Sequence, residues 1–197
     1  MIDYIKGEIT ELTPAHTVLE TSGIGYFINI SLTTYSALNG KKETQLFIYE
    51  AIREDAHTLF GFMTRAEREL FLLLISVSGI GANTARVIMS SYSDSELQQI
   101  IATENVTALN AIKGIGSKTA QRIIVDLKDK ILKLGVGDAK SGNTATLELN
   151  PVREETLAAL AALGFAAVSS QKVLDKILSG NPDATVEQAI KQALKML

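Results

Sequence analysis

The chain has 197 residues, of which 46% are hydrophobic and 21% are charged, and this composition excludes collagen-like, low-complexity and disordered proteins. It contains no cysteine and two histidines, which excludes disulfides and thiolate metal sites and leaves too few ligands for a zinc centre. Residues 1–63 hold 4 Lys and Arg and 8 Asp and Glu, residues 64–140 hold 10 and 8, and residues 141–197 hold 5 and 6. Only the middle segment has a positive net charge, so we expect an anionic ligand to bind there.

Residues 1–63 are predicted to form a β-barrel. Short runs rich in β-branched and aromatic residues begin at Tyr4, Thr17, Tyr26, Phe47 and Thr58, and turn residues separate them. Five short strands in so few residues are typical of an OB-like barrel, because a sandwich needs more strands.

The last predicted hairpin of this barrel carries two adjacent acidic residues, Glu54 and Asp55, at its turn. Such residues are common in ordinary solvated turns. The sequence places no other acid or histidine where it would complete a metal or acid–base site with them, so a catalytic role is disfavoured.

Residues 64–134 are predicted to form a helical domain. Thr64 and Ser93 are each followed three residues later by a glutamate, which is the spacing of a capping box at a helix start. Apolar residues then recur at helical intervals. Residues 135–150 lose this periodicity and are predicted to be a flexible linker.

Residues 151–197 are predicted to form a three-helix bundle. Pro151 is suited to the first position of a helix, and Gly164 to the end of that helix. Thr185, with Gln188 three residues later, predicts the start of the third helix.

An internal repeat is the most informative feature of the helical domain. The segment Val77–Met89 recurs 35 residues later as Ile112–Ile124, with six of thirteen positions identical. Each copy holds a Gly-Ile-Gly turn between two helices, at residues 79–81 and 114–116. Glycines allow backbone amides to approach an anion closely, and the next helix offers its own unpaired amides, so the turn suits a phosphate oxygen. The competing interpretation is a plain helix–turn–helix connection in which the glycines only serve packing.

The residues around both turns favour phosphate binding because several are cationic. The predicted contacts are Gly79, Gly81, Asn83, Thr84, Arg86, Lys113, Gly114, Gly116, Ser117, Lys118, Thr119 and Arg122. Asn83 stands where the second copy has Lys118, so the first turn is expected to depend more on backbone amides and on Arg86. Neither turn has the glycine spacing of a nucleotide P-loop, so we expect no ATPase site in the chain.

These residues resemble the helix-hairpin-helix DNA-binding motif, whose Gly-hydrophobic-Gly turn binds the sugar–phosphate backbone without reading bases. The order of a barrel with an acidic hairpin, two such motifs, a linker and a small helical domain is similar to the RuvA family of Holliday junction-binding subunits. The resemblance covers the whole chain. It implies a multidomain α+β protein without a catalytic site and with a C-terminal bundle of the ubiquitin-associated type.

The resemblance also implies partners. Four copies, as a homotetramer or within an octamer, would hold a four-way junction open, with Glu54 and Asp55 repelling phosphate at its centre. The bundle would dock on the hexameric RuvB ATPase, which drives branch migration in homologous recombination and DNA repair, and the RuvC resolvase would join the same complex. ATP and magnesium belong to that ATPase, so no cofactor is expected here. The implied ATPase contacts are Leu160, Leu163, Phe165 and Ile190.

Two other functions are compatible with parts of the sequence. A helix-hairpin-helix glycosylase or nuclease would use Asp126 or the Glu54–Asp55 pair, but a glycosylase pocket needs aromatic walls and residues 64–197 hold only three aromatics. A single-strand-binding barrel would need basic, stacking residues on a segment that is instead acidic. The N-terminus lacks a signal-peptide pattern and no apolar run is long enough to span a bilayer, so we expect a cytoplasmic protein without membrane contact.

Overall fold

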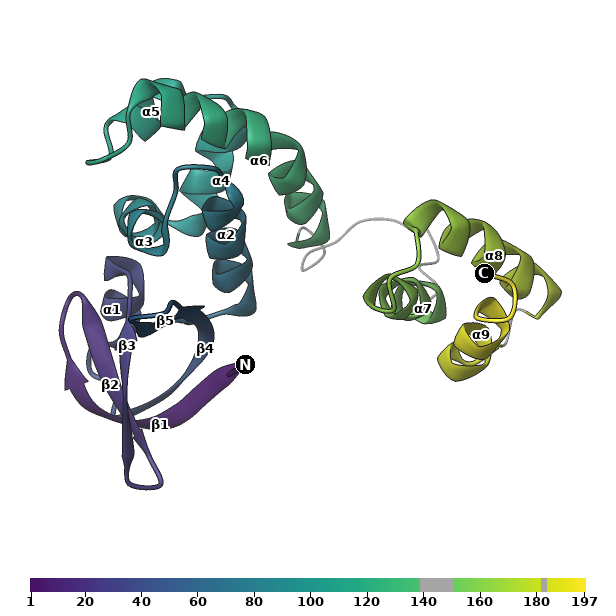
Figure 1. Cartoon of the computed structure of the whole chain (residues 1–197), viewed down its shortest axis with the longest axis horizontal. Coiled ribbons are helices and arrows are strands. Elements are labelled where there is room, and N and C mark those ends of the chain that lie inside the picture. The colour runs from purple at the N-terminus through teal and green to yellow at the C-terminus, as the bar shows by residue number, and fades with distance from the viewer. Residues whose placement is uncertain (139–150, 182–183) are drawn as a thin grey trace. The chain divides into compact units, whose positions relative to one another are not determined.

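The computed structural model describes residues 1–138, 151–181 and 184–197. They form two compact units, one within residues 1–138 and the other within residues 151–197 (Figure 1). The first unit combines strands and helices and the second is helical, which confirms the predicted α+β class. Within the described residues, no helix is both long and apolar enough to cross a membrane.

The N-terminal barrel is closed in the strand order β1-β2-β3-β5-β4 (Figure 1). Its strands are β1 (Tyr4–Leu12), β2 (His16–Thr21), β3 (Ile24–Asn29), β4 (Glu43–Ile52) and β5 (His57–Phe62). Strands β3 and β5 pair in parallel, and the other neighbours are antiparallel. Inward-facing side chains such as Leu19, Ile28 and Leu46 fill the interior, which confirms the predicted five-stranded barrel.

A short helix, α1 (Leu32–Leu38), lies in the segment where the sequence predicts only strands. The side chain of Ser31 accepts a hydrogen bond from the N–H of Thr34 and caps the helix start. Seven residues that include two threonines have a weak intrinsic tendency to form a helix, so the sequence pattern does not reveal it. A tertiary contact stabilises it: Thr33 Oγ1 donates to the carbonyl of Met89 (3.0 Å).

The helical part of the first unit shares an apolar core with the barrel. It consists of α2 (Arg65–Ser76), α3 (Ala82–Ser91), α4 (Asp94–Ala102), α5 (Val106–Asn110) and α6 (Ser117–Asp138). The ring of Phe71 on α2 lies 4.9 Å from that of Phe62 and 5.5 Å from that of Phe60, centroid to centroid. The barrel and these helices therefore bury one continuous cluster of side chains.

The helix starts agree with the sequence prediction better than the end of α6 does. Thr64 caps α2, and Ser93 forms a complete capping box at the start of α4. Helix α6 continues to Asp138, although the sequence predicts a linker from residue 135. Extending an existing helix needs no new nucleation, so two glycines that cost about 1 kcal/mol each do not stop it. The rest of the predicted linker lies outside the described residues.

The second unit is a bundle of α7 (Pro151–Ala162), α8 (Ala167–Gly180) and α9 (Val186–Ala193), as predicted. Gly164 has φ +92° and ends α7 in a Schellman motif, in which the N–H of Phe165 donates to the carbonyl of Leu160 (3.1 Å). Thr185 forms the expected capping box with Gln188. The core of the bundle consists of Leu160, Leu174, Ile177, Ala189 and Ala193.

We expect Thr156→Val to stabilise this bundle. The Thr156 side chain is fully buried, and its Oγ1 has no hydrogen-bond partner among the residues that the structure describes. A buried unpaired hydroxyl costs about 1 kcal/mol or more, and valine has nearly the same shape. Amide hydrogen exchange in α7 and α9 should therefore slow by about fivefold in the full chain. Ser170→Ala is the matched control, because the buried hydroxyl of Ser170 donates a hydrogen bond to the carbonyl of Ala166. Unchanged hydrogen exchange in Thr156→Val would contradict the prediction.

Candidate nucleic-acid interface

The first Gly-Ile-Gly turn joins α2 to α3. The N–H of Ile80 donates to the carbonyl of Val77 (3.0 Å), and the side chain of Ile80 is buried, so the turn is anchored in the core. Gly79 has φ +94°, a left-handed conformation that costs other residues about 1 to 2 kcal/mol. Gly81 is the N-cap of α3 and provides no side-chain cap, so the first amides of α3 are open to an anion.

The second turn repeats this geometry between α5 and α6. The N–H of Ile115 donates to the carbonyl of Ile112 (3.0 Å), Ile115 is buried, and Gly114 has φ +91°. The carbonyl of Gly116 accepts from the N–H of Ala120 at 2.9 Å, as the equivalent carbonyl does in the first turn. The sequence repeat is therefore a structural repeat.

At two positions of these turns, neither the backbone conformation nor packing among the described residues requires a glycine. Gly81 has φ −90°, which any residue adopts, and Gly116 is not in the left-handed region either. A Cβ built at Gly81 or at Gly116 would meet no atom within 4 Å. The missing side chains therefore leave room for something that approaches from outside, which is what amides facing a phosphate require.

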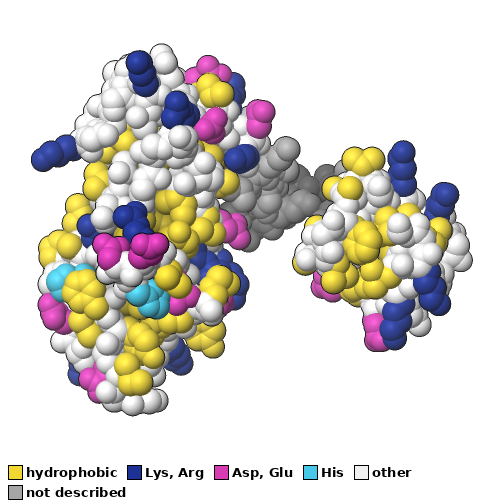
Figure 2. Space-filling view, in the orientation of Figure 1, with side chains coloured by type: hydrophobic (Ala, Val, Ile, Leu, Met, Phe, Trp, Pro, Cys, Tyr) yellow, Lys and Arg dark blue, Asp and Glu magenta, His cyan; other side chains and the backbone are white. Residues whose placement is uncertain are grey.

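The second turn carries more positive charge than the first. Lys113 and Lys118 flank its glycines and are exposed, whereas the equivalent of Lys118 in the first turn is the neutral Asn83. Figure 2 shows Lys and Arg side chains projecting from the helical part of this unit. The other predicted contacts at the helix starts are exposed or half-buried: Thr84, Ser117 and Thr119.

The two predicted arginines have contacts within the chain that the sequence does not reveal. Arg86 Nη1 donates to the carbonyl of Ala15 in the barrel (2.8 Å), and Arg122 Nη1 donates to the carbonyl of Ser78 in the first turn (3.0 Å). Arg86 therefore ties α3 to the barrel, and Arg122 ties α6 to the first turn. Their predicted contact with phosphate stays a prediction.

The acidic residues Glu54 and Asp55 lie in an exposed turn between β4 and β5. A hydrogen bond from the N–H of Arg53 to the carbonyl of Ala56 closes this turn (2.8 Å). No ion pair found in residues 1–138, 151–181 and 184–197 includes either carboxylate, so both charges face solvent. Over the same residues, no group of three His, Asp or Glu side chains is placed to hold a metal ion, and Asp126 is exposed on α6.

Comparisons with known proteins match this architecture along the whole chain. The model of the RuvA N terminal domain matches residues 1–61, that of the SAM-like helix-hairpin-helix tandem residues 71–129, and that of the RuvA C-terminal domain residues 151–197. The chain is 57% identical over 201 residues to the Holliday junction branch migration complex subunit RuvA of Bacteroides thetaiotaomicron, and 51% identical over 202 residues to that of Porphyromonas gingivalis. Both alignments cover 100% of each chain. The chain belongs to the RuvA family.

The three matched regions correspond to the parts of the fold already described. The RuvA N-terminal region covers the barrel and its acidic turn, the tandem region covers both Gly-Ile-Gly turns, and the RuvA C-terminal region covers α7 to α9. The predicted RuvA family and helix-hairpin-helix repeat are therefore confirmed. The boundaries predicted between the domains, at residues 63, 134 and 150, stay predictions.

Two arginines of α2 clamp the RuvA barrel to the helices. Arg68 Nη1 donates to Asp3 Oδ1 (2.7 Å) and to the carbonyl of Ile48 (3.2 Å), and Arg65 pairs with the same aspartate (3.1 Å). The hydrogen bond from Arg68 lowers the pKa of Asp3 below its ordinary value. Both guanidinium groups also lie over the ring of Phe47, at 5.0 and 5.7 Å from its centroid. Because α2 leads into the first turn, this clamp helps to fix that turn relative to the acidic turn.

The structure corrects one of the residues expected to contact an ATPase. Leu160 is fully buried in the bundle core, because it lies on the face of α7 that packs against α8 and α9, so it offers no surface. Phe165 and Ile190 are half-buried, whereas Leu163 is 58% exposed. Four further apolar side chains of this unit are exposed, which the sequence pattern does not reveal: Val168, Leu194, Met196 and Leu197.

Proposed function

We propose that this chain binds four-way (Holliday) junction DNA through its phosphates, holds the junction open, and recruits a RuvB-type hexameric ATPase for branch migration in homologous recombination and DNA repair. The observation that carries this function is the structural repeat of two Gly-Ile-Gly turns in one compact unit with an exposed acidic turn. The names of the relatives, which are subunits of a Holliday junction branch migration complex, support it. A chromosomal DNA ligand implies that the chain acts in the cytoplasm.

The turns bind the DNA backbone rather than the bases. Amides that follow Gly81 and Gly116 donate to phosphate oxygens, and Lys113 and Lys118 add positive charge. Phosphates carry no sequence information, so binding is independent of sequence. Binding releases counterions from the DNA, so affinity falls steeply as the salt concentration rises.

Fourfold assembly gives the acidic turn its role. Each of four copies holds one arm, as a tetramer or as half of an octamer, and contributes Glu54 and Asp55 to the centre. Like charges that gather where water is scarce interact several-fold more strongly than in bulk water. The central carboxylates therefore repel phosphates, which keeps the crossover open and the arms apart.

An apolar depression beside the acidic turn supports self-assembly. The cavity has a volume of about 490 Å³ and is lined by Met1, Ile48, Tyr49, Glu50, Ile52, Arg68, Glu69 and Leu72. Ile52 is 70% exposed and Leu72 is 40% exposed, which is unfavourable unless another surface covers them. A second copy of this chain is the occupant we propose, because Ile52 lies two residues before the acidic pair that fourfold symmetry would gather.

We expect Ile52→Asp combined with Leu72→Asp to abolish self-assembly without unfolding the chain. Both side chains are exposed in the single chain, so the charges disturb only a surface that another copy covers. Light scattering coupled to size-exclusion chromatography should give a multiple of the 21.2 kDa chain mass for the wild type and the monomer mass for the variant. Ile24→Asp, another exposed apolar position on the barrel and outside this cavity, is the control. A variant that keeps the wild-type mass would contradict the prediction.

The C-terminal bundle provides the surface for the ATPase. Leu163 and Val168 are 58% and 66% exposed on either side of the Gly164 turn. A bundle that belongs to the same chain as a junction-binding unit raises the local concentration of its partner at the DNA. ATP and magnesium are bound by that partner, so we assign no cofactor to this chain. A RuvC-type resolvase is a further expected partner.

A gel-shift competition between an immobile four-way junction and a linear duplex of the same sequence tests this function. The junction should bind the chain, and an excess of duplex should not displace it. Equal binding to both DNAs would contradict the proposal. The same mixtures incubated with magnesium test the glycosylase or nuclease alternative, which the comparisons do not favour, because an enzyme would cut strands or release a base.

A further inference from the structure

The first helix-hairpin-helix turn lacks a cationic side chain that the second turn has. Asn83 takes the place of Lys118, and a neutral side chain attracts phosphate less than an ammonium group does. The guanidinium of Arg86 donates to the carbonyl of Ala15 and is therefore held against the barrel. The first turn nevertheless keeps the open amides and the bare Gly81 of a phosphate site.

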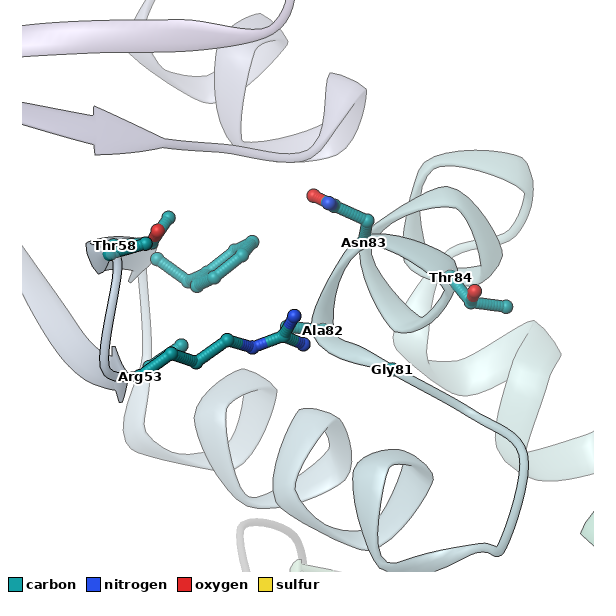
Figure 3. Close-up of a pocket in the computed structure, with 9 residues that line it drawn as sticks. Arg53, Thr58, Gly81, Ala82, Asn83 and Thr84 are labelled. Carbon is teal, nitrogen blue, oxygen red and sulfur yellow. The ribbon is translucent and has the colours of Figure 1, made fainter.

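A cavity separates this turn from the acidic hairpin of the barrel. Its volume is about 190 Å³, and it is lined by Ala51, Arg53, Ala56, Thr58, Phe60, Gly81, Ala82, Asn83 and Thr84. Figure 3 shows the side chain of Arg53 extending from the hairpin so that its guanidinium points toward Ala82, at the start of α3. The side chain of Asn83 points into the same cavity from the opposite side (Figure 3).

The guanidinium of Arg53 is available for a ligand. Arg53 is exposed, and its side chain takes part in no ion pair or hydrogen bond with the described residues, not even with the neighbouring Glu54 and Asp55. A guanidinium stays charged at all physiological pH values and donates in a planar fork that fits two oxygens of a phosphate. The side chain of Arg53, the residues that begin α3 and the side chain of Asn83 therefore line one cavity.

We propose that Arg53 supplies the cation of the first phosphate site, in place of the lysine that the second hairpin carries. The proposal rests on the phosphate-binding function proposed above. The first site is then built from two parts of the fold, the barrel hairpin and the helix-hairpin-helix turn, whereas the second site is built from one. Because Arg53 directly precedes the acidic pair, the phosphate it binds is the one beside the crossover. Attraction at Arg53 and repulsion at Glu54 and Asp55 together set where each arm leaves the centre.

Arg53→Gln tests the proposal, with Asn83→Lys as its rescue. Arg53→Gln should weaken binding to an immobile four-way junction by about tenfold or more. The slope of log affinity against log salt concentration should fall by about 0.9 for each phosphate that the variant no longer neutralises. Adding Asn83→Lys to Arg53→Gln restores a cation on the opposite wall of the cavity, so it should recover most of the affinity and of the slope.

Two matched variants separate this proposal from the general function. Lys6→Gln removes one exposed charge from β1, outside the cavity, and should leave the slope unchanged. Lys118→Gln should weaken the junction complex through the second hairpin. If Lys118→Gln weakens binding but Arg53→Gln behaves like Lys6→Gln, or if Asn83→Lys fails to rescue, the role of Arg53 is wrong and the proposed function stands. If the wild type does not prefer the junction at all, the proposed function itself is wrong.

Discussion

Replacing Gly81 and Gly116 together by alanine is expected to weaken junction binding by about 100-fold or more without lowering the stability of the fold. Neither glycine has a left-handed backbone, and a Cβ at either position meets no atom within 4 Å. The added methyl groups therefore disturb nothing in the described chain, but they keep phosphate away from the amides. Each turn loses at least one charge-assisted hydrogen bond of about 1.5 kcal/mol or more, and about 1.4 kcal/mol is a factor of ten. Gel shifts and thermal unfolding of the same samples measure both quantities.

Two further alanine variants separate the loss of phosphate binding from other effects of replacing a glycine. Gly114→Ala should lower the free energy of unfolding by about 1 to 2 kcal/mol, because residue 114 has φ +91°. Gly180→Ala, at an open position in the second unit, should not lower stability and should not change DNA binding. If the Gly81→Ala/Gly116→Ala variant binds the junction as tightly as the wild type, the glycines have only a packing role and the phosphate interpretation is wrong.

Replacing Glu54 by Gln and Asp55 by Asn is expected to reduce the preference for a junction over a linear duplex by about tenfold or more. The two exposed carboxylates have no cationic partner among the described residues, so their field acts directly on approaching phosphates. A continuous duplex places phosphates where an open junction leaves a gap, so the neutral variant should bind duplex more tightly and junction about as well. Fluorescent base analogues at the crossover should also report less unpairing.

A charge-matched control separates the position of the carboxylates from their number. Glu20→Gln with Glu43→Gln also removes two exposed carboxylates from the barrel. Glu43 is the first residue of β4, and the acidic turn follows its last, so about 30 Å of strand separates them. The control should leave the preference for the junction unchanged. Equal effects of the two double variants would show that only net charge matters.

Much of the candidate site follows from local patterns. The repeat around Gly79 and Gly114 was visible because a left-handed turn between helices requires glycine, and the structure has positive φ at both positions. The caps at Ser93 and Thr185 were visible for a similar reason, since their partners lie three residues away. The RuvA family resemblance joined these local features into one function, and the family matches confirm the membership.

Other parts of the site depend on residues far apart in the chain. Arg86 donates to a carbonyl 71 residues away and Arg122 to one 44 residues away, so the sequence showed their charge but not their partners. Helix α1 forms in a segment of weak helix propensity because it docks on α3. A leucine stripe does not show which members face inward, which is why Leu160 was expected at a surface that it does not reach.

By itself, the sequence determined most of the elements, the two turns and their glycines, because hydrophobic period, capping and backbone φ are properties of a few neighbouring residues. Only the tertiary structure decided which charged side chains are available to act on DNA. It held Arg86 against the barrel, left Arg53 facing the first turn across a cavity, and kept Glu54 and Asp55 out of every ion pair among the described residues. The physical reason is that an ion's role depends on what the fold brings within a few ångströms of it, and that distance is set by packing between elements rather than by their sequence spacing.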